Sequence, residues 1–266
     1  MKLLSSILRE MSISASKIVR ENRLELIDLV IGLKYAIAIV EGPEGKAAGL
    51  CFVDYLDLHA DPPILEVRNL DELLNSPYHL WRVAGVAIAN AAFQYDLWIR
   101  NNVQGLRIED VGNQGIKPLL DELMSRQPVL IVGNMVPIVN YLCSKGVEVF
   151  VVERNPLFRY KCLTDASLKF VVKKAKSAIV TGASIPNGTI DELLELLRSA
   201  KFIVVVGPTA QLDPRLLHAK GVNAVASSRV IDISRALEIV KRGGGRHDLP
   251  QAMRDYIAYP ISPRNS

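Results

Sequence analysis

The residues of this sequence that are best suited to bind a ligand are glycines, hydroxyls and amides that follow short apolar runs. They are Gly133, Pro137, Thr181, Gly182, Asn187, Gly188, Thr189, Gly207, Pro208 and Thr209. Three separate runs end at these residues, and each run is short and rich in Val and Ile. Exposed amides at such chain positions favour an anionic group. The pattern therefore predicts one shared pocket for a small, anionic molecule.

Glu153 ends a further apolar run and lies 20 residues after Gly133. Rossmann domains use a carboxylate at this distance to bind ribose hydroxyls, and the carboxylate also makes Glu153 the candidate catalytic residue. Gly133 lacks the second and third glycines of the dinucleotide fingerprint, which argues against a nucleotide. The alternative is that Glu153 pairs with neighbouring Arg154 or is solvated.

Two of these polar residues have a structural explanation as well. Thr189 and Glu192 match a capping box, in which Thr189 caps a helix and Gly188 permits an unusual backbone angle. Asn90 is a polar amide inside the mostly apolar segment 79–94, so we expect it either to bond to nearby backbone or to reach a ligand. Asp54 and Asp57 are expected to face solvent.

The sequence contains no motif for a metal site or for a standard hydrolase. Its four histidines and three cysteines are scattered, without the spacings of zinc sites, so we predict no metal site made by the protein alone. A P-loop and a nucleophile elbow are absent from the sequence, and the cofactor stays unknown. Aromatic residues make up only 6%, so nucleic-acid binding is not expected.

Strand-like and helical segments alternate in the second part of the chain. The predicted strands are 128–132, 147–152, 177–181, 202–206 and 222–226. The predicted helices are 136–145, 165–174, 189–199, 213–219 and 232–242. Continuously apolar strands separated by helices predict a parallel sheet that is covered on both faces. The fold class is therefore α/β, with a Rossmann-like, doubly wound domain in the C-terminal part.

The first part of the chain predicts a smaller α+β domain. An amphipathic helix is expected within 1–11, strands at 35–41 and 50–56 around a loop at 42–49, and helices at 71–75 and 79–94. Turn residues within 101–115 place the boundary between domains 1–110 and 111–266. Charge changes at the same point, since residues 1–110 carry a net −4 and residues 111–266 a net +8.

The same composition predicts a cytoplasmic protein. The longest apolar runs are shorter than the roughly 18–20 residues that span a bilayer, so no membrane association is expected. Three widely spaced cysteines suit free thiols in a reducing compartment. Self-association to a homo-oligomer is left open.

Three segments resemble one known family, the Rossmann-like "putative heavy-metal chelation" domain of unknown function. They are VGNMVPIVNYL (132–142), IVTGASIPNGTIDELL (179–194) and VVVGPTAQLDPRLLHAKGV (204–222). The likeness extends over about 112–245, and the order of its motifs is specific. Upstream, GVAIANA (85–91) is similar to a helix of the enolase N-terminal-like domain that usually precedes this family's domain.

The resemblance implies a small-molecule pocket between the two domains, linked to metal-chelating compounds. It assigns ligand contact to the positions named above, including Asn90 and Glu153. The first hypothesis is an enzyme that acts on, or makes, a metal-chelating or heteroaromatic compound. A non-catalytic carrier or sensor of a metal chelate is the alternative, and a nucleotide- or S-adenosylmethionine-dependent enzyme is the third possibility.

Overall fold

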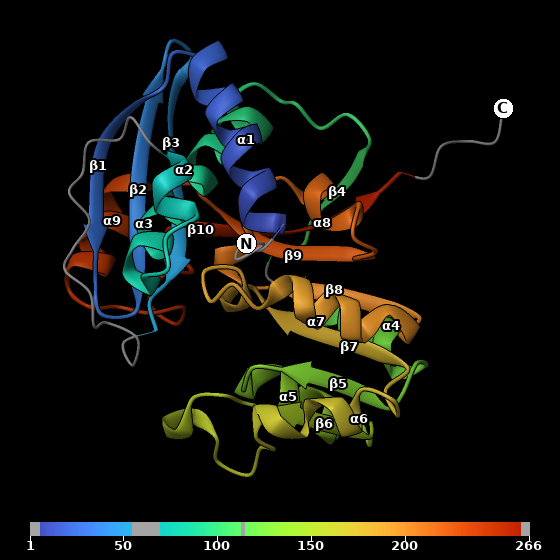
Figure 1. The fold of residues 1–266 in the computed structure, drawn as a ribbon. Helices are drawn as coiled ribbons and strands as arrows, with labels where there is room; N and C mark the ends of the chain where they lie inside the picture. Colours follow the sequence, from blue (N-terminus) through green and yellow to red (C-terminus); the bar gives the residue numbers. More distant parts are fainter. Residues whose placement is uncertain (1–5, 55–69, 113–114, 262–266) are drawn as a thin grey trace, which may run out of the picture.

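The computed structural model describes residues 6–54, 70–112 and 115–261, which form two β-sheets with helices around them (Figure 1). The smaller sheet is antiparallel and has the order β1-β2-β3, with strands β1 (Glu25–Ile31), β2 (Tyr35–Gly42) and β3 (Gly45–Phe52). The larger sheet has seven strands in the order β4-β10-β9-β8-β7-β5-β6. The α/β class predicted from the sequence is confirmed.

The hairpin of the small sheet is longer and tighter than the sequence predicted. Strand β3 begins at Gly45, so most of the expected loop 42–49 is strand. Gly42 pairs with Gly45, which leaves a two-residue connection. The expected loop was wrong because Lys46, Ala47 and Ala48 pair with β2 despite their low strand propensity. Strand β1 was not predicted, since its side chains are exposed or half-buried.

Three helices cover one face of the small sheet: α1 (Ser6–Glu21), α2 (Leu70–Leu74) and α3 (His79–Gln94), the last continued by a π-helical turn, Tyr95–Ile99. Helix α3 is buried along nearly its whole length, as the sequence indicated. Its backbone lies directly on β3, because a Cβ added to Gly49 would be 2.1 Å from the amide nitrogen of Ala91. Small residues on both elements allow this close approach.

The five predicted parallel strands lie next to one another in the large sheet, with β6 at its edge. They are β5 (Val129–Val132), β6 (Val149–Val152), β7 (Ser177–Thr181), β8 (Phe202–Val206) and β9 (Ala224–Val230). The sheet is mixed, however, because β10 (Met253–Pro260) and β4 (Leu106–Asp110) are antiparallel to their neighbours at one edge. Charged residues interrupt both strands, which read LRIED and MRDYIAYP, so neither is a continuous apolar run and neither was predicted.

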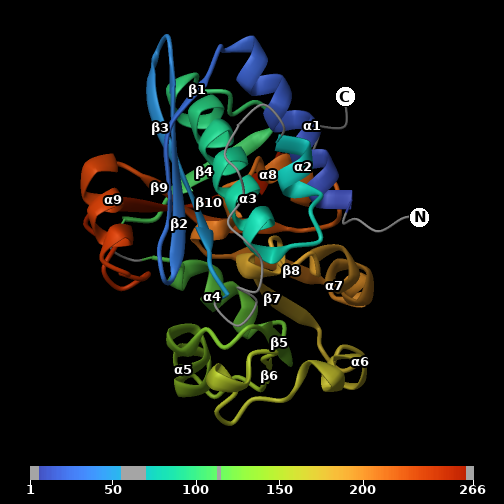
Figure 2. The same cartoon turned by 60° about the vertical axis from the view of Figure 1, so that its left-hand side comes forward.

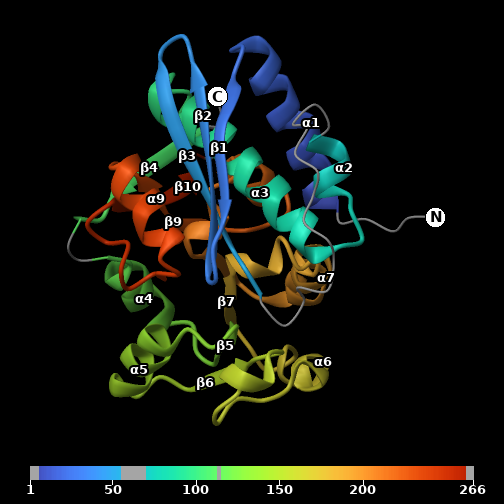
Figure 3. The same cartoon turned by 90° about the vertical axis from the view of Figure 1, so that its left-hand side faces the viewer.

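Helices cover both faces of the large sheet, as in a doubly wound fold (Figure 3). Apolar residues of α4 (Lys117–Met124) and α5 (Val136–Ser144) pack on one face. The other face is covered by α6 (Leu168–Val171), α7 (Ile190–Leu196) and α8 (Pro214–His218). Successive β5 residues alternate between the faces, since Leu130 packs with α7 while Ile131 packs with α5. Predicted helix 165–174 contains only a 3₁₀ turn and the four-residue α6.

The last helix joins the two sheets. Helix α9 (Ile233–Lys241) packs against the face of the small sheet opposite α3, where Ala236 and Val240 contact Tyr35 and Ile37 (Figures 2 and 3). Strand β4 precedes residue 111 and yet pairs in the large sheet. The two sheets therefore share helices and a continuous interior. None of the described helices combines the length and apolar character that crossing a lipid bilayer requires.

Candidate functional site

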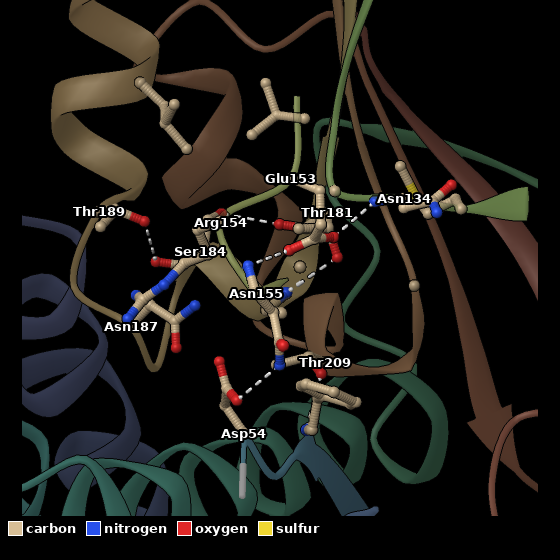
Figure 4. A pocket seen from close by; sticks show the side chains of 18 of the residues that line it. Asp54, Asn134, Glu153, Arg154, Asn155, Thr181, Ser184, Asn187, Thr189 and Thr209 are labelled. Atoms are coloured by element: carbon tan, nitrogen blue, oxygen red, sulfur yellow. Dashed lines mark hydrogen bonds between the residues drawn. The ribbon is translucent and has the colours of Figure 1, made fainter. Parts of the chain in front are cut away.

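A cavity of about 700 Å³ lies between the end of β3 and the carboxyl ends of β5, β6, β7 and β8 (Figure 4). Nine of the residues predicted to bind a ligand line it: Gly133, Glu153, Thr181, Gly182, Asn187, Thr189, Gly207, Pro208 and Thr209. Asn90, Pro137 and Gly188 do not line it. The carboxyl edge of a parallel sheet is where ligands bind in doubly wound folds.

Glycines shape the floor of this cavity. Gly133 adopts a φ of 97° directly after β5, and a Cβ there would be 2.8 Å from Cγ2 of Thr181. Gly207 has a φ of 121° directly after β8. Residues with a Cβ atom rarely adopt positive φ angles such as these, so the backbone conformation at both strand ends requires glycine. These glycines allow the chain to turn away from the sheet and leave the space above it open.

Glu153 connects two loops at the edge of the cavity. Its Oε2 accepts a hydrogen bond from the amide of Asn134 at 2.8 Å, and its Oε1 accepts one from the amide of Asn155 at 2.8 Å (Figure 4). The carboxylate thus holds the chain after β5 to the chain after β6. Asn134 follows Gly133 at a strand end where the sequence predicted exposed amides, and its amide donates to Glu153 instead.

The loop after β7 is held by its own hydroxyl groups. Ser184 Oγ donates to the carbonyl of Thr181 at 2.7 Å, and Thr181 Oγ1 accepts from the amide of Ala183. The predicted capping box is wrong, because Thr189 adopts helical angles and its hydroxyl donates to the carbonyl of Ser184 at 3.4 Å. Asn187 differs from these groups, since its Oδ1 is buried and has no hydrogen-bond partner among the described residues.

Asn90 belongs to a polar junction between the two sheets. Its Nδ2 donates to the carbonyls of Leu50 (2.8 Å) and Thr209 (2.9 Å), so it bonds to backbone. Thr209 Oγ1 in turn accepts from the amide of Phe52 at 2.9 Å. Gln211 Oε1 accepts from the amide of Leu50 at 2.6 Å. Edge strand β3 therefore finds its partners in side chains that follow β8.

Gln94 and Gln211 complete this junction, and the sequence reasoning missed both. Gln94 Nε2 donates to the carbonyl of Gln211 at 2.8 Å, while Gln211 Nε2 donates to the carbonyl of Ser228. The available signal was the spacing of Asn90 and Gln94, two amides four residues apart in an apolar helix. Such a pair points to one side of the helix and requires partners there.

Asp54 was predicted to face solvent, and this was wrong. It is 5% exposed, lines the cavity at the end of β3, and its Oδ1 accepts from Nδ2 of Asn155 at 3.3 Å (Figure 4). Asn155 is itself buried and accepts from the amide of Leu157. Asp54 and Asn155 bring the small sheet into contact with the chain after β6. Asp57 lies outside the described residues.

The described side chains do not gather into a metal site. Within residues 6–54, 70–112 and 115–261, no three His, Cys, Asp or Glu side chains lie close enough together to hold one ion. Burial and the charge of Glu153 raise the pKa of Cys162, and burial raises that of Cys51 well above its usual value. A raised pKa disfavours the thiolate form that binds soft metals.

The sequence matches, over residues 119–259, the DUF364 family, which is described as "Putative heavy-metal chelation". The chain belongs to this family. An uncharacterized protein of Methanocaldococcus jannaschii is 29% identical over 230 residues, which covers 84% of this chain and 85% of that protein. The resemblance of the three motifs at 132–142, 179–194 and 204–222 is thereby confirmed.

Two solved structures of the DUF364 family have the same fold. The one from Pyrococcus horikoshii superposes with a TM-score of 0.80 at 29% identity and covers 94% of this chain and 98% of that chain. The one from Desulfitobacterium hafniense has a TM-score of 0.72 at 18% identity, with coverages of 95% and 99%. Both are described as proteins of unknown function. Both sheets thus belong to the family's architecture.

The family description implies a heavy metal, and the described residues do not fit a bare ion. The cavity of this protein offers carboxylates, amides and hydroxyls, whereas heavy metals prefer thiolate and imidazole donors. No histidine or cysteine is among the described residues that line the cavity. An organic chelator that brings its own donor atoms fits this lining better than a metal ion does.

Proposed function

We propose that this DUF364 protein binds a small organic metal chelator, or its metal complex, in the cavity between the two sheets. The observation that carries the proposal is the cavity itself: about 700 Å³, with polar side chains from both sheets and with aromatic side chains. Cavities of roughly 300–1,000 Å³ with such a lining are typical of small-molecule sites.

The proposal extends to catalysis: the protein is an enzyme that acts on this ligand. Asp54 is the carboxylate that the geometry favours for such a role, because it is buried at the cavity and positioned by Asn155. Glu153, the candidate from the sequence, is less suited, since each of its oxygens already accepts a backbone amide. A carrier or sensor would need the same cavity without any proton transfer by Asp54.

A nucleotide- or S-adenosylmethionine-dependent enzyme is the weaker candidate. The ribose of such a cofactor would require the Glu153 carboxylate as its hydrogen-bond acceptor. That carboxylate already accepts two backbone amides and holds two loops together. Helix α5 carries Pro137 in its first turn, which removes one of the amides that would bind a pyrophosphate. A flat titration with these cofactors is the expected result.

Native mass spectrometry of freshly purified protein, with elemental analysis of the same sample, tests the proposal. We expect an excess mass that is released as an organic compound on denaturation, with or without a metal. Addition of a strong competing chelator should remove metal from the sample and leave the organic compound bound. A protein that carries metal alone, and loses all of it to the competitor, would contradict the proposal.

A further inference from the structure

The side chains around the cavity carry an excess of negative charge. Four of the described residues that line it are carboxylates, namely Asp54, Glu153, Asp165 and Glu192, and Arg154 is the only basic one among them. No lysine or histidine is among the lining residues within the described ranges. In the low dielectric of a partly closed cavity, this imbalance favours a ligand with positive charge.

Several backbone amides at the strand ends around the cavity already donate within the protein. The amides of Asn134 and Asn155 donate to Glu153, and the amide of Gly207 donates to the carbonyl of Ala226. The amide of Ala183 donates to Thr181 Oγ1. The strand-end residues led us to expect an anionic ligand, because the sequence alone shows no partners for the amides at such positions.

An acceptor in the same cavity lacks a donor. Asn187 Oδ1 is buried and has no hydrogen-bond partner among the described residues, although a buried acceptor without one is unfavourable by about 1–3 kcal/mol. Asn187 lies across the open space from Asp54, and the two side chains extend toward each other (Figure 4). A ligand group placed between them would meet one carboxylate and one amide oxygen.

Aromatic residues supply the apolar side of the cavity. Phe52 and Tyr35, which pack edge to face with ring centroids 5.9 Å apart, and Phe158 all line it. Flat rings of this kind accept another ring as a neighbour. The lining therefore combines an apolar surface for a ring with acceptors for a charged donor group.

We propose that the ligand is an amine-bearing heteroaromatic compound whose ammonium group lies between Asp54 and Asn187. This inference rests on the proposed function, because it names the chemical class of the molecule in the same cavity. It reverses the expected sign of the ligand's charge.

Two probes that share a pyridine ring and a chelating geometry separate the charge of the ligand from its shape. One is 2-(aminomethyl)pyridine and the other is pyridine-2-carboxylate, each titrated calorimetrically at pH 7 without added metal. We expect the amine to bind at least tenfold more tightly. Tighter binding of the carboxylate would overturn the inference and leave the proposed function standing. Binding of neither probe would count against the proposed function itself.

Two variants locate the bound amine. Asp54→Asn and Asn187→Ala should each weaken binding of the amine about tenfold and leave binding of the carboxylate unchanged. Asp110→Asn is the matched control, because Asp110 is an exposed carboxylate on β4 outside the cavity. If Asp54→Asn fails to fold, Glu192→Gln removes an exposed carboxylate of the lining instead and should weaken the amine severalfold. Unchanged amine affinity in the folded variants would overturn the inference.

Discussion

The polar junction and the cavity are neighbouring regions built from the same kinds of residue, yet they do different things. In the junction, Asn90, Gln94 and Gln211 use their amide groups to satisfy backbone around β3. In the cavity, Asn187 keeps a buried Oδ1 that has no hydrogen-bond partner among the described residues, beside about 700 Å³ of open space. Asn90 Oδ1 in the junction lacks a described partner as well, but Asn90 does not line that open space. The role of a side-chain amide therefore depends on whether unpaired backbone groups lie within its hydrogen-bonding distance.

Thr209 lies where the two regions meet. Its hydroxyl accepts from the amide of Phe52, and its side chain also lines the cavity. Substitutions in the junction should lower stability and spare ligand binding, whereas substitutions in the cavity should do the reverse.

Gln211→Ala gives the largest expected loss of stability. It removes the acceptor of the Leu50 amide and the donor to the Ser228 carbonyl, both buried. Each group left unpaired is unfavourable by about 1–3 kcal/mol, so we expect a loss of about 2–6 kcal/mol in urea unfolding. Gln104→Ala, at an exposed position, is the control for side-chain truncation. A loss below about 1 kcal/mol would show that the junction is not what holds β3.

Alkaline pH should lower the stability of the protein through Tyr256, whose hydroxyl accepts a hydrogen bond from Nε2 of Gln94 in the junction at 3.4 Å. Burial raises the pKa of Tyr256 to about 12 from its usual 10.0, so the folded state keeps a proton that the unfolded state releases. The stabilisation that this retained proton gives is fully present below pH 10. Between pH 10 and 12 the free energy of unfolding falls by about 1.4 kcal/mol for each pH unit. Urea unfolding of wild type and Tyr256→Phe across this range should show a shallower decline in the variant. Parallel declines would contradict the assignment.

Asn90→Ala tests the helix side of the junction. Two buried carbonyls, those of Leu50 and Thr209, would lose their donor, which predicts a loss of about 2 kcal/mol. Affinity of the folded variant for the probe amine should equal that of wild type, because Asn90 does not line the cavity. Weakened binding with unchanged stability would restore the expectation that Asn90 contacts the ligand.

Thr209→Val should affect both regions. It leaves the amide of Phe52 without its acceptor, and we expect a loss of about 1–2 kcal/mol with some weakening of binding. Thr209→Ser keeps the hydroxyl and should retain most of the stability. Equal losses in the two variants would assign the effect to packing of the methyl group.

Asn187→Ala should have the smallest effect on stability, within about 0.5 kcal/mol, because its Oδ1 makes no hydrogen bond to the described residues that would be lost. The same variant should nevertheless bind the probe amine about tenfold more weakly. Urea unfolding and calorimetric titration on one preparation give both numbers. A large loss of stability would place Asn187 in the structural group.

The sequence predicted the parallel strands well because they are buried on both faces and read as continuous apolar runs. It missed β4 and β10, whose apolar residues are interrupted by charged ones and which form strands by pairing at the edge that β9 provides. It also located the carboxyl edge of the sheet correctly. Gly133, Thr181 and Gly207 lie at the carboxyl ends of the neighbouring strands β5, β7 and β8, so the pairing of these strands is enough to bring them together.

The partners of those residues could not be predicted, since they come from distant segments. Asp54 and Asn155 are separated by 101 positions, and Asn90 and Thr209 by 119. The sequence of one segment shows that an amide or carboxylate is present. It does not show which distant residues form hydrogen bonds with that group in the folded protein. Glu153 and Asn90 were therefore predicted to bind a ligand, and the structure shows both bonded to backbone.

One measurement tests the account most directly: titration of the probe amine into a variant whose cavity is filled. Ala183 lines the cavity, and Ala183→Phe would occupy it, while Ala219→Phe adds the same ring at an exposed position on the C-terminal end of α8. With both variants folded, we predict that Ala183→Phe abolishes binding and Ala219→Phe leaves it unchanged. Wild-type affinity in Ala183→Phe would contradict the claim that this cavity is the binding site.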